Sequence, residues 1–172
     1  QIVTPTVIGN SIVFDSDGLV SFNTTSLVLS EMNTSIVNLN SQYIVKDDML
    51  FFQCGIPSLG YELCVSNGDD AWLHSDYASG MDSSTPQHFT IVEDRLIGLV
   101  DHPTEGGQLV EIRDEGMVLL WDYHSGNFDA GTQGKIWFDN QMIYFIGDDP
   151  AVGLEMYGWA YGELTDDWIV IH

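Results

Sequence analysis

Short apolar runs alternate with turn-forming residues along the whole chain. Gly, Asn, Asp and Ser interrupt the sequence every eight to twelve residues, and the apolar runs between them include residues 49–52, 97–100, 117–121, 143–146 and 169–171. This rhythm is typical of all-β proteins. Several runs are apolar at consecutive positions, as expected for strands that are covered on both faces. The pattern therefore predicts an all-β protein built from short, buried strands.

The landmarks of this pattern repeat with a period of about 46 residues. An apolar run follows Asp48, Asp94 and Asn140, which are 46 residues apart. Gly60-Tyr61-Glu62-Leu63 corresponds to Gly106-Gly107-Gln108-Leu109 and, with one inserted residue, to Gly153-Leu154-Glu155-Met156. About four strands are predicted in each repeat, and a 40–50-residue period with four strands indicates a β-propeller blade. We expect a single β-propeller domain over 1–172 with about four blades, in units of approximately 10–47, 48–93, 94–139, and 140–172 plus 1–9.

The two ends of the chain suggest how the last blade is completed. Three strands are predicted in the last unit, and the fourth is missing. The segment Thr4-Pro5-Thr6-Val7-Ile8 is similar to Thr85-Pro86-Gln87-His88-Phe89, which introduces the fourth strand of a complete unit. We therefore expect the N-terminal strand to complete the last blade. Pairing within one chain closes a ring, whereas pairing with a neighbouring chain forms a polymer, and the sequence leaves both open.

One copy of the repeat resembles a known family. The segment Gly60-Tyr61-Glu62-Leu63-Cys64-Val65-Ser66-Asn67-Gly68, followed by residues 76–86, is similar to the ELWxxDGT repeat of large secreted bacterial proteins, which is associated with propeller-like arrays. The resemblance is clearest over residues 46–92. Cys64 replaces the Trp of the family, and Asn67-Gly68-Asp69 replaces its Asp-Gly-Thr. The resemblance implies a secreted, non-enzymatic repeat protein and supplies no catalytic residues.

The charge of the chain excludes several classes of partner. Its 172 residues include 26 acidic and 4 basic side chains, which gives a formal net charge of −22. Nucleic acids and anionic membrane surfaces are poor partners, because both require clustered Lys and Arg. No apolar stretch approaches the roughly 18 residues that membrane insertion needs. Self-repulsion at this charge favours a setting that is rich in cations.

Oxygen ligands for calcium are the best candidates for a metal site. Asp15-Ser16-Asp17-Gly18 places alternate carboxylates before a turn, and Asn67-Gly68-Asp69 is a weaker version. We predict Ca²⁺ at Asp15 and Asp17, and less strongly at Asn67 and Asp69. A tight turn without metal is the alternative interpretation, because the EF-hand pattern is incomplete. The histidines lack zinc-site spacing, and no Gly-x-Ser-x-Gly elbow is present, so we expect no enzyme.

Two covalent modifications are consistent with an extracellular protein. Cys54 and Cys64 lie on adjacent predicted strands, and a hairpin centred at residue 59 makes them face each other. A disulfide is expected in an oxidising exterior, with two reduced cysteines as the alternative. Asn23-Thr24-Thr25 and Asn33-Thr34-Ser35 fit the glycosylation sequon, with unmodified loop Asn as the alternative.

These observations lead to two functional hypotheses. The first is a secreted, non-catalytic structural protein that self-assembles into an extracellular fibre or surface layer with calcium, through the assembly strand Thr4, Pro5, Thr6, Val7 and Ile8. The alternative is a monomeric, carbohydrate-binding β-propeller whose aromatic rings stack on glycans. The chain begins at Gln1, which is compatible with a mature product after signal removal and equally with a partial sequence.

Overall fold

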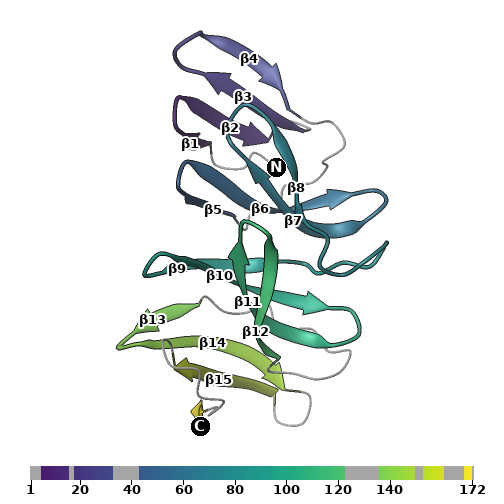
Figure 1. Ribbon diagram of the computed structural model, residues 1–172, viewed down its shortest axis with the longest axis vertical. Coiled ribbons are helices and arrows are strands. Elements are labelled where there is room, and N and C mark those ends of the chain that lie inside the picture. The colour runs from purple at the N-terminus through teal and green to yellow at the C-terminus, as the bar shows by residue number, and fades with distance from the viewer. Residues whose placement is uncertain are drawn as a thin grey trace. The chain divides into compact units, whose positions relative to one another are not determined.

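The computed structural model describes residues 5–15, 18–32, 43–122, 136–149, 153–160 and 169–171. Within these ranges the protein consists of strands and loops, which confirms the prediction of an all-β protein (Figure 1). The same ranges contain no helix that is long and apolar enough to cross a membrane. The chain divides into two compact units, Gln1–Gln87 and His88–His172, and we describe each unit by itself.

The first unit contains two four-stranded sheets, in each of which the strands follow chain order. Sheet 1 consists of β1 (Thr6–Ile8), β2 (Ser11–Asp15), β3 (Leu19–Asn23) and β4 (Val28–Glu31). Sheet 2 consists of β5 (Tyr43–Lys46), β6 (Met49–Ile56), β7 (Gly60–Ser66) and β8 (Ala71–Ser75). Each sheet is therefore an antiparallel meander.

The second unit repeats this arrangement. Sheet 3 consists of β9 (Gln87–Val92), β10 (Arg95–His102), β11 (Gly106–Arg113) and β12 (Gly116–Asp122). Sheet 4 consists of β13 (Trp137–Asp139), β14 (Met142–Asp149), β15 (Gly153–Ala160) and β16 (Ile169–Ile171). The described residues thus form four similar sheets from consecutive stretches of sequence.

A two-residue turn joins the first two strands of every sheet. These turns are Gly9-Asn10, Asp47-Asp48, Glu93-Asp94 and Asn140-Gln141. Both residues have positive φ in the Asp47-Asp48 turn (51° and 57°) and in the Asn140-Gln141 turn (48° and 66°). Positive φ at both central positions is characteristic of the type I′ turns that match the twist of a hairpin. The landmarks Asp48, Asp94 and Asn140 therefore mark the first hairpin of a sheet.

Each sheet begins one strand earlier in the chain than the repeat unit that the sequence suggested. β9, which was expected to end the unit 48–93, is the first strand of sheet 3. β1 likewise belongs to sheet 1, where Val7 pairs with Ile12, and sheet 4 has its own first strand, β13. The expectation that the N-terminal strand completes the last blade is therefore wrong for this chain. Closing a two-residue hairpin costs far less chain entropy than pairing strands from the two ends of the sequence.

The similarity between residues 4–8 and 85–89 has a simpler origin. Both segments lead into the first strand of a sheet, β1 and β9. The similarity was real, but it identifies equivalent strands of two sheets and not a strand that is missing from the last one. Thr4 lies outside the described residues, whereas Pro5 precedes β1 and Thr6, Val7 and Ile8 form it.

We expect Gln141→Gly to stabilise the protein by about 1 kcal/mol. Gln141 holds a φ of 66°, which costs a residue with a Cβ but not glycine, and the change creates the Asn-Gly sequence preferred in type I′ turns. Urea unfolding monitored by circular dichroism measures the effect. Gln141→Ala is the control, because alanine keeps the Cβ; an equal gain from alanine would contradict the conformational explanation.

Each unit has its own hydrophobic core. In the first unit, Ile8, Val13 and Leu19 of sheet 1 pack with Leu50 and Phe52 of sheet 2. In the second unit, residues of sheet 3 pack with residues of sheet 4 around an aromatic cluster. The ring centroids of Trp121 lie 5.7 Å from Phe145 and 5.6 Å from Tyr157, with edge-to-face geometry. Within each unit, one sheet therefore packs face to face on the next.

Small residues allow sheet 1 to approach a loop of sheet 2 closely. The Ser21 hydroxyl donates a hydrogen bond to the Gly68 carbonyl, and the Ser11 hydroxyl lies 3.5 Å from a carboxylate oxygen of Asp69. A Cβ at Gly68, where φ is +91°, would lie 2.8 Å from the Cβ of Ser11. Only glycine fits at this position, so the loop between β7 and β8 is part of the contact between the two sheets.

Candidate functional site

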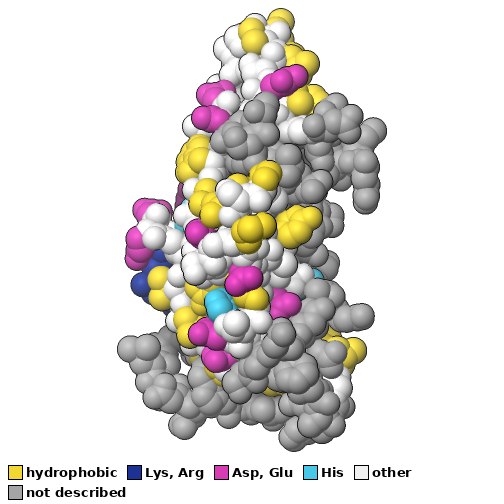
Figure 2. Space-filling view, turned by 90° about the vertical axis from the view of Figure 1, so that its right-hand side faces the viewer, with side chains coloured by type: hydrophobic (Ala, Val, Ile, Leu, Met, Phe, Trp, Pro, Cys, Tyr) yellow, Lys and Arg dark blue, Asp and Glu magenta, His cyan; other side chains and the backbone are white. Residues whose placement is uncertain are grey.

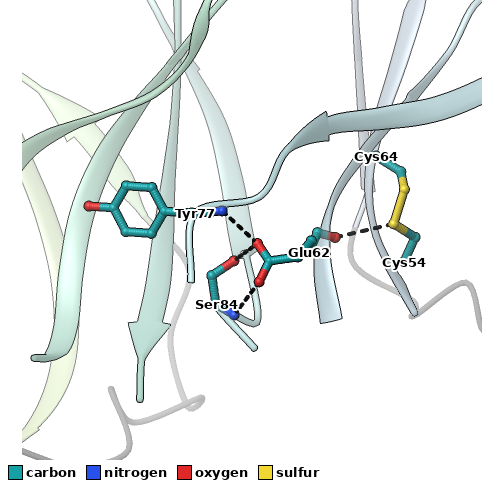
Figure 3. The surroundings of a disulfide bond; sticks show 5 residues. All are labelled: Cys54, Glu62, Cys64, Tyr77 and Ser84. Atoms are coloured by element: carbon teal, nitrogen blue, oxygen red, sulfur yellow. Dashed lines mark hydrogen bonds between the residues drawn. A yellow bond between two sulfur atoms is a disulfide. The ribbon is translucent and has the colours of Figure 1, made fainter. Parts of the chain in front are cut away.

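Glu62 is the most deeply buried charged residue among those described, and it binds the segment that leaves sheet 2 (Figure 3). Its side chain is inaccessible to solvent on β7. One carboxylate oxygen accepts the Tyr77 amide at 3.0 Å and the Ser84 hydroxyl at 2.6 Å, and the other accepts the Ser84 amide at 3.0 Å. Because these donors follow β8 in the chain, Glu62 fixes the connection between β8 and β9. We call this group, Glu62 with Tyr77 and Ser84, the Glu62 latch.

The backbone beside Glu62 holds the same segment. The Tyr61 amide donates to the Ser83 hydroxyl at 2.9 Å, and the Tyr61 carbonyl accepts the amides of Ser84 and Thr85 at 3.0 and 3.1 Å. Gly60 has a φ of +81°, and a Cβ there would lie 2.5 Å from the Ser83 hydroxyl oxygen. Glycine is therefore required next to the latch, which explains the Gly-x-Glu order of the repeat landmark in this copy.

A disulfide lies beside the latch on the same hairpin. Cys54 of β6 and Cys64 of β7 are joined, with their Cα atoms 5.7 Å apart, and neither is exposed to solvent. The register pairs Cys54 with Glu62, and Cys64 with Phe52. The two cysteines are therefore diagonal neighbours, and the hairpin is centred one residue before residue 59. The Glu62 carbonyl oxygen lies 3.4 Å from the Cys54 sulfur.

Burial raises the pKa of the Glu62 carboxyl, although the hydrogen bonds from Ser84 and Tyr77 oppose this effect. A buried carboxyl with a raised pKa is a pattern found in general acids and bases. Such a group must reach a substrate, however, and the Glu62 side chain has no exposed surface. Its oxygens already accept three hydrogen bonds from the connection that follows β8. This geometry fits the positioning of a loop better than proton transfer.

Glu111 of β11 is the second charged centre, and it binds two arginines. Nε and Nη2 of Arg95 lie 2.6 and 2.5 Å from its carboxylate oxygens, and those of Arg113 lie 2.8 and 2.5 Å from one of them. Glu111 is buried, whereas both arginines are partly exposed. These hydrogen bonds and the two positive charges lower the pKa of Glu111, and burial opposes them. Two of the four basic residues of the chain are thus used in one structural ion cluster.

Glu111→Gln is expected to lower the free energy of unfolding at pH 7 by about 1.5 kcal/mol, because it removes charge-assisted hydrogen bonds to partly exposed arginines. The folded-state pKa of Glu111 lies below its unfolded value of 4.5. Its contribution is therefore complete above pH 4.5 and is lost as the pH falls through the folded-state pKa. Urea unfolding at pH 7 and at pH values below 4.5 should show the difference between wild type and variant shrinking with acid. A constant difference would contradict the assigned ion cluster.

Of the four predicted calcium ligands, Asn67 and Asp69 have side chains in the described part of the chain. Asp15 ends β2, but its side chain and Asp17 lie outside the described residues. The Asn67 side-chain oxygen accepts the amides of Asp69 and Asp70 at 3.0 and 2.9 Å, so it stabilises its own loop. Among the described residues, no group of three or more His, Cys, Asp or Glu is placed to hold a metal ion.

Of the two predicted glycosylation sites, one lies in the described part of the chain. The Asn23 side-chain oxygen accepts the amides of Thr25 and Ser26 at 3.0 and 2.9 Å, which organises the turn between β3 and β4. This arrangement uses the oxygen, whereas a glycan attaches to the amide nitrogen. Asn33 lies outside the described residues.

The sequence did not single out Glu62 or Glu111 as structural centres. A signal for Glu62 was present, because Glu62, Gln108 and Glu155 occupy the same place after the repeated glycine. Gln108 is also fully buried, and its amide donates to Glu105 at 2.9 Å. Glu111 had no comparable signal in the repeat, and one of its two partners, Arg95, lies on another strand, 16 residues away.

No protein-family model matches the chain, and no curated protein sequence matches it. Inference about its function therefore starts from the geometry of the described residues.

Proposed function

We propose that the protein is a secreted, non-catalytic structural protein that self-assembles into an extracellular fibre or surface layer. The observation that carries this proposal is the apolar edge of sheet 1. β4 is the last strand in the order of that sheet. Its first two residues, Val28 and Leu29, and Leu27 directly before it are 52–72 % exposed. An exposed edge strand with apolar side chains is a site at which protein chains associate.

The buried disulfide supports an extracellular location. Disulfides persist in oxidising surroundings and are rare in the cytosol. The Cys54–Cys64 bond lies in the core of the first unit, where it stabilises the hairpin that carries the Glu62 latch. The resemblance of this hairpin to the ELWxxDGT repeat of secreted proteins agrees with the same location.

The charged groups of the interior support a structural rather than a catalytic role. Glu62 binds a loop, and Glu111 binds two arginines, so the two carboxylates that are buried in the described part of the chain have structural partners. On the face drawn in Figure 2, acidic side chains are spread over the surface, and Lys and Arg appear at one place. This distribution suits a solvated acidic surface better than a focused binding site.

The repeated sheets support blades of the propeller type as the building unit. Every sheet is a four-stranded meander that begins with a two-residue hairpin, as in a propeller blade. Calcium belongs to the same proposal, because 26 carboxylates against 4 basic groups repel one another unless cations screen them. Asp15 and Asp17 remain the proposed ligands.

A carbohydrate-binding protein is the second candidate. The observation that favours it is the partial exposure of large aromatic rings, namely Tyr61, Trp72 and Trp137. Exposed aromatic faces can stack on sugar rings. Binding of the folded protein to a glycan array, lost in Trp72→Ala or Trp137→Ala, would favour this candidate over assembly.

Electron microscopy and light scattering of the purified protein, with calcium and with a chelator, test the proposed function. We expect particles much larger than one chain, and we expect calcium to increase their number. Monodisperse particles of 19.1 kDa under both conditions would contradict self-assembly. Assembly that is unaffected by the chelator would contradict the calcium part alone.

A further inference from the structure

The loop between β7 and β8 contains the chain's one Asn-Gly sequence, Asn67-Gly68. An Asn side chain can react with the backbone nitrogen of a following glycine, because glycine has no Cβ to block the approach. Hydroxide first takes the proton from the Gly68 nitrogen, which then attacks Cγ of Asn67. A C–N bond forms, the bond from Cγ to the side-chain nitrogen breaks, and that nitrogen takes a proton from water and leaves as ammonia. Water then opens the cyclic imide to aspartate or isoaspartate.

The fold protects the nitrogen that must react. The Gly68 amide donates to the Ser66 hydroxyl at 3.0 Å, and both residues are buried. Hydroxide must reach this N–H to remove its proton, as it must in hydrogen exchange. A buried, hydrogen-bonded amide exchanges when the structure around it opens locally. The closed loop therefore holds Gly68 in a state that cannot attack Asn67.

The same loop is fixed on both sides of the reacting atoms. The Asn67 side-chain oxygen accepts the amides of Asp69 and Asp70, which restrains Cγ. The Gly68 carbonyl accepts the hydroxyl of Ser21 from sheet 1. Ring closure joins Cγ to the Gly68 nitrogen and reorients the peptide unit between Asn67 and Gly68. The reaction therefore requires the loop to leave its contact with sheet 1.

We propose that Asn67-Gly68 is a deamidation site that the contact between sheets 1 and 2 keeps slow. This modification goes beyond the proposed function and does not depend on self-assembly. The loss of one hydrogen bond of typical strength changes an opening equilibrium about fivefold. Two hydrogen bonds hold Gly68 in place, from its amide to Ser66 and from Ser21 to its carbonyl. Together they should slow the reaction roughly 20-fold relative to the unfolded chain.

The isoaspartate product changes the contact between the two sheets. It places one more carbon in the backbone of the loop, and a Cβ at Gly68 would already lie 2.8 Å from the Cβ of Ser11. The new carboxylate joins Asp69, one of whose carboxylate oxygens lies 3.5 Å from the Ser11 hydroxyl. The isoaspartate form should therefore lose part of the contact with sheet 1 and unfold at a lower urea concentration than the unmodified protein.

Incubation of the full-length protein at mildly alkaline pH tests the proposal. Mass spectrometry of peptides follows the reaction, because an oxygen replaces an NH group at Asn67. The rate in the folded protein is compared with the rate in the same chain unfolded in guanidinium chloride. Ser66→Ala removes the acceptor of the Gly68 amide, and Ser21→Ala releases the Gly68 carbonyl. Ser79→Ala is the control, because Ser79 is exposed in the connection after β8.

Gln141→Gly supplies an internal reference. It creates a second Asn-Gly sequence at residues 140–141, in a turn whose two residues are both exposed. We expect this turn to react at close to the unfolded rate in the same folded molecules in which Asn67 reacts slowly. Circular dichroism shows that each variant is folded before its rate is measured.

We expect the reaction at Asn67 to be roughly 20-fold slower in the folded protein than in the unfolded chain, and about fivefold faster in either Ser66→Ala or Ser21→Ala than in the wild type. Ser79→Ala should react at the wild-type rate. Equal rates in the folded and unfolded chain, or serine variants that both react like the wild type, would overturn the proposal. A faster reaction in the folded protein would overturn it as well, and would show that the amides of Asp69 and Asp70 activate the Asn67 side chain.

Discussion

Glu62→Ala is expected to lower the free energy of unfolding by about 3 kcal/mol, because it removes the carboxylate that accepts the buried Ser84 hydroxyl and the partly buried Tyr77 amide. The Tyr77 amide and the Ser84 hydroxyl lose the carboxylate that they bind, whereas the Ser84 amide keeps the Tyr61 carbonyl at 3.0 Å. Urea unfolding at neutral pH measures the loss. Glu31→Ala is the control, because Glu31 is an exposed glutamate on β4, and we expect a change below about 0.5 kcal/mol there.

The pH dependence of the same site has the opposite sign to that of Glu111. Since the folded-state pKa of Glu62 is raised above 4.5, the part of its contribution that depends on proton binding is complete below pH 4.5 and is lost as the pH rises through the folded-state pKa. The hydrogen bonds that its oxygens accept are a separate contribution, which the alanine variant tests at neutral pH. Glu62→Gln keeps one acceptor oxygen and removes the buried charge, so it should cost less than alanine at pH 7. If glutamine were as destabilising as alanine, the ionised carboxylate and not its role as acceptor would be essential.

Removing the disulfide should lower the free energy of unfolding about as much as Glu62→Ala does. The Cys54→Ala/Cys64→Ala variant is expected to lose about 3 kcal/mol, because a cross-link closing a loop of roughly ten residues restricts the unfolded chain by that amount. The bond joins residues ten positions apart in the core of the first unit. Urea unfolding with and without dithiothreitol measures the loss, and the reduced wild type should approach the stability of the variant.

Two outcomes would contradict this account of the disulfide. Titration of the denatured, unreduced protein with a thiol reagent should detect no free cysteine, and two free thiols would show that the bond is not formed. A double variant as stable as the oxidised wild type would show that the bond adds nothing. Because Cys54 pairs with Glu62 across the hairpin, we also expect the losses of stability in Glu62→Ala and in Cys54→Ala/Cys64→Ala to be non-additive when the variants are combined.

The fold class could be predicted because the apolar runs and turns recur so regularly. Asp48 and Asn140 were recognised as landmarks, and both lie in the first hairpin of a sheet. The strand at which each sheet begins could not be predicted, since a repeating series of strands has the same period wherever it is divided. Because the expected units began one strand late, β13 fell at the end of the unit 94–139. The last unit therefore lacked a strand in the sequence, and the N-terminal strand was assigned to it.

The candidate site could be predicted only where its residues are close in sequence. Cys54 and Cys64 belong to one hairpin, so their equal distance from its predicted turn indicated that they pair. The predicted centre, residue 59, was one residue too late. The Glu62 latch depends on Tyr77 and Ser84, 15 and 22 residues away, in a connection without a periodic pattern.

Electron cryo-microscopy of the purified protein at high concentration tests the central claim most directly, because it shows how copies are arranged. We predict filaments or layers that contain many copies, with β1 paired to β2 in the same chain. Single particles of one chain at every concentration would contradict the proposed self-assembly.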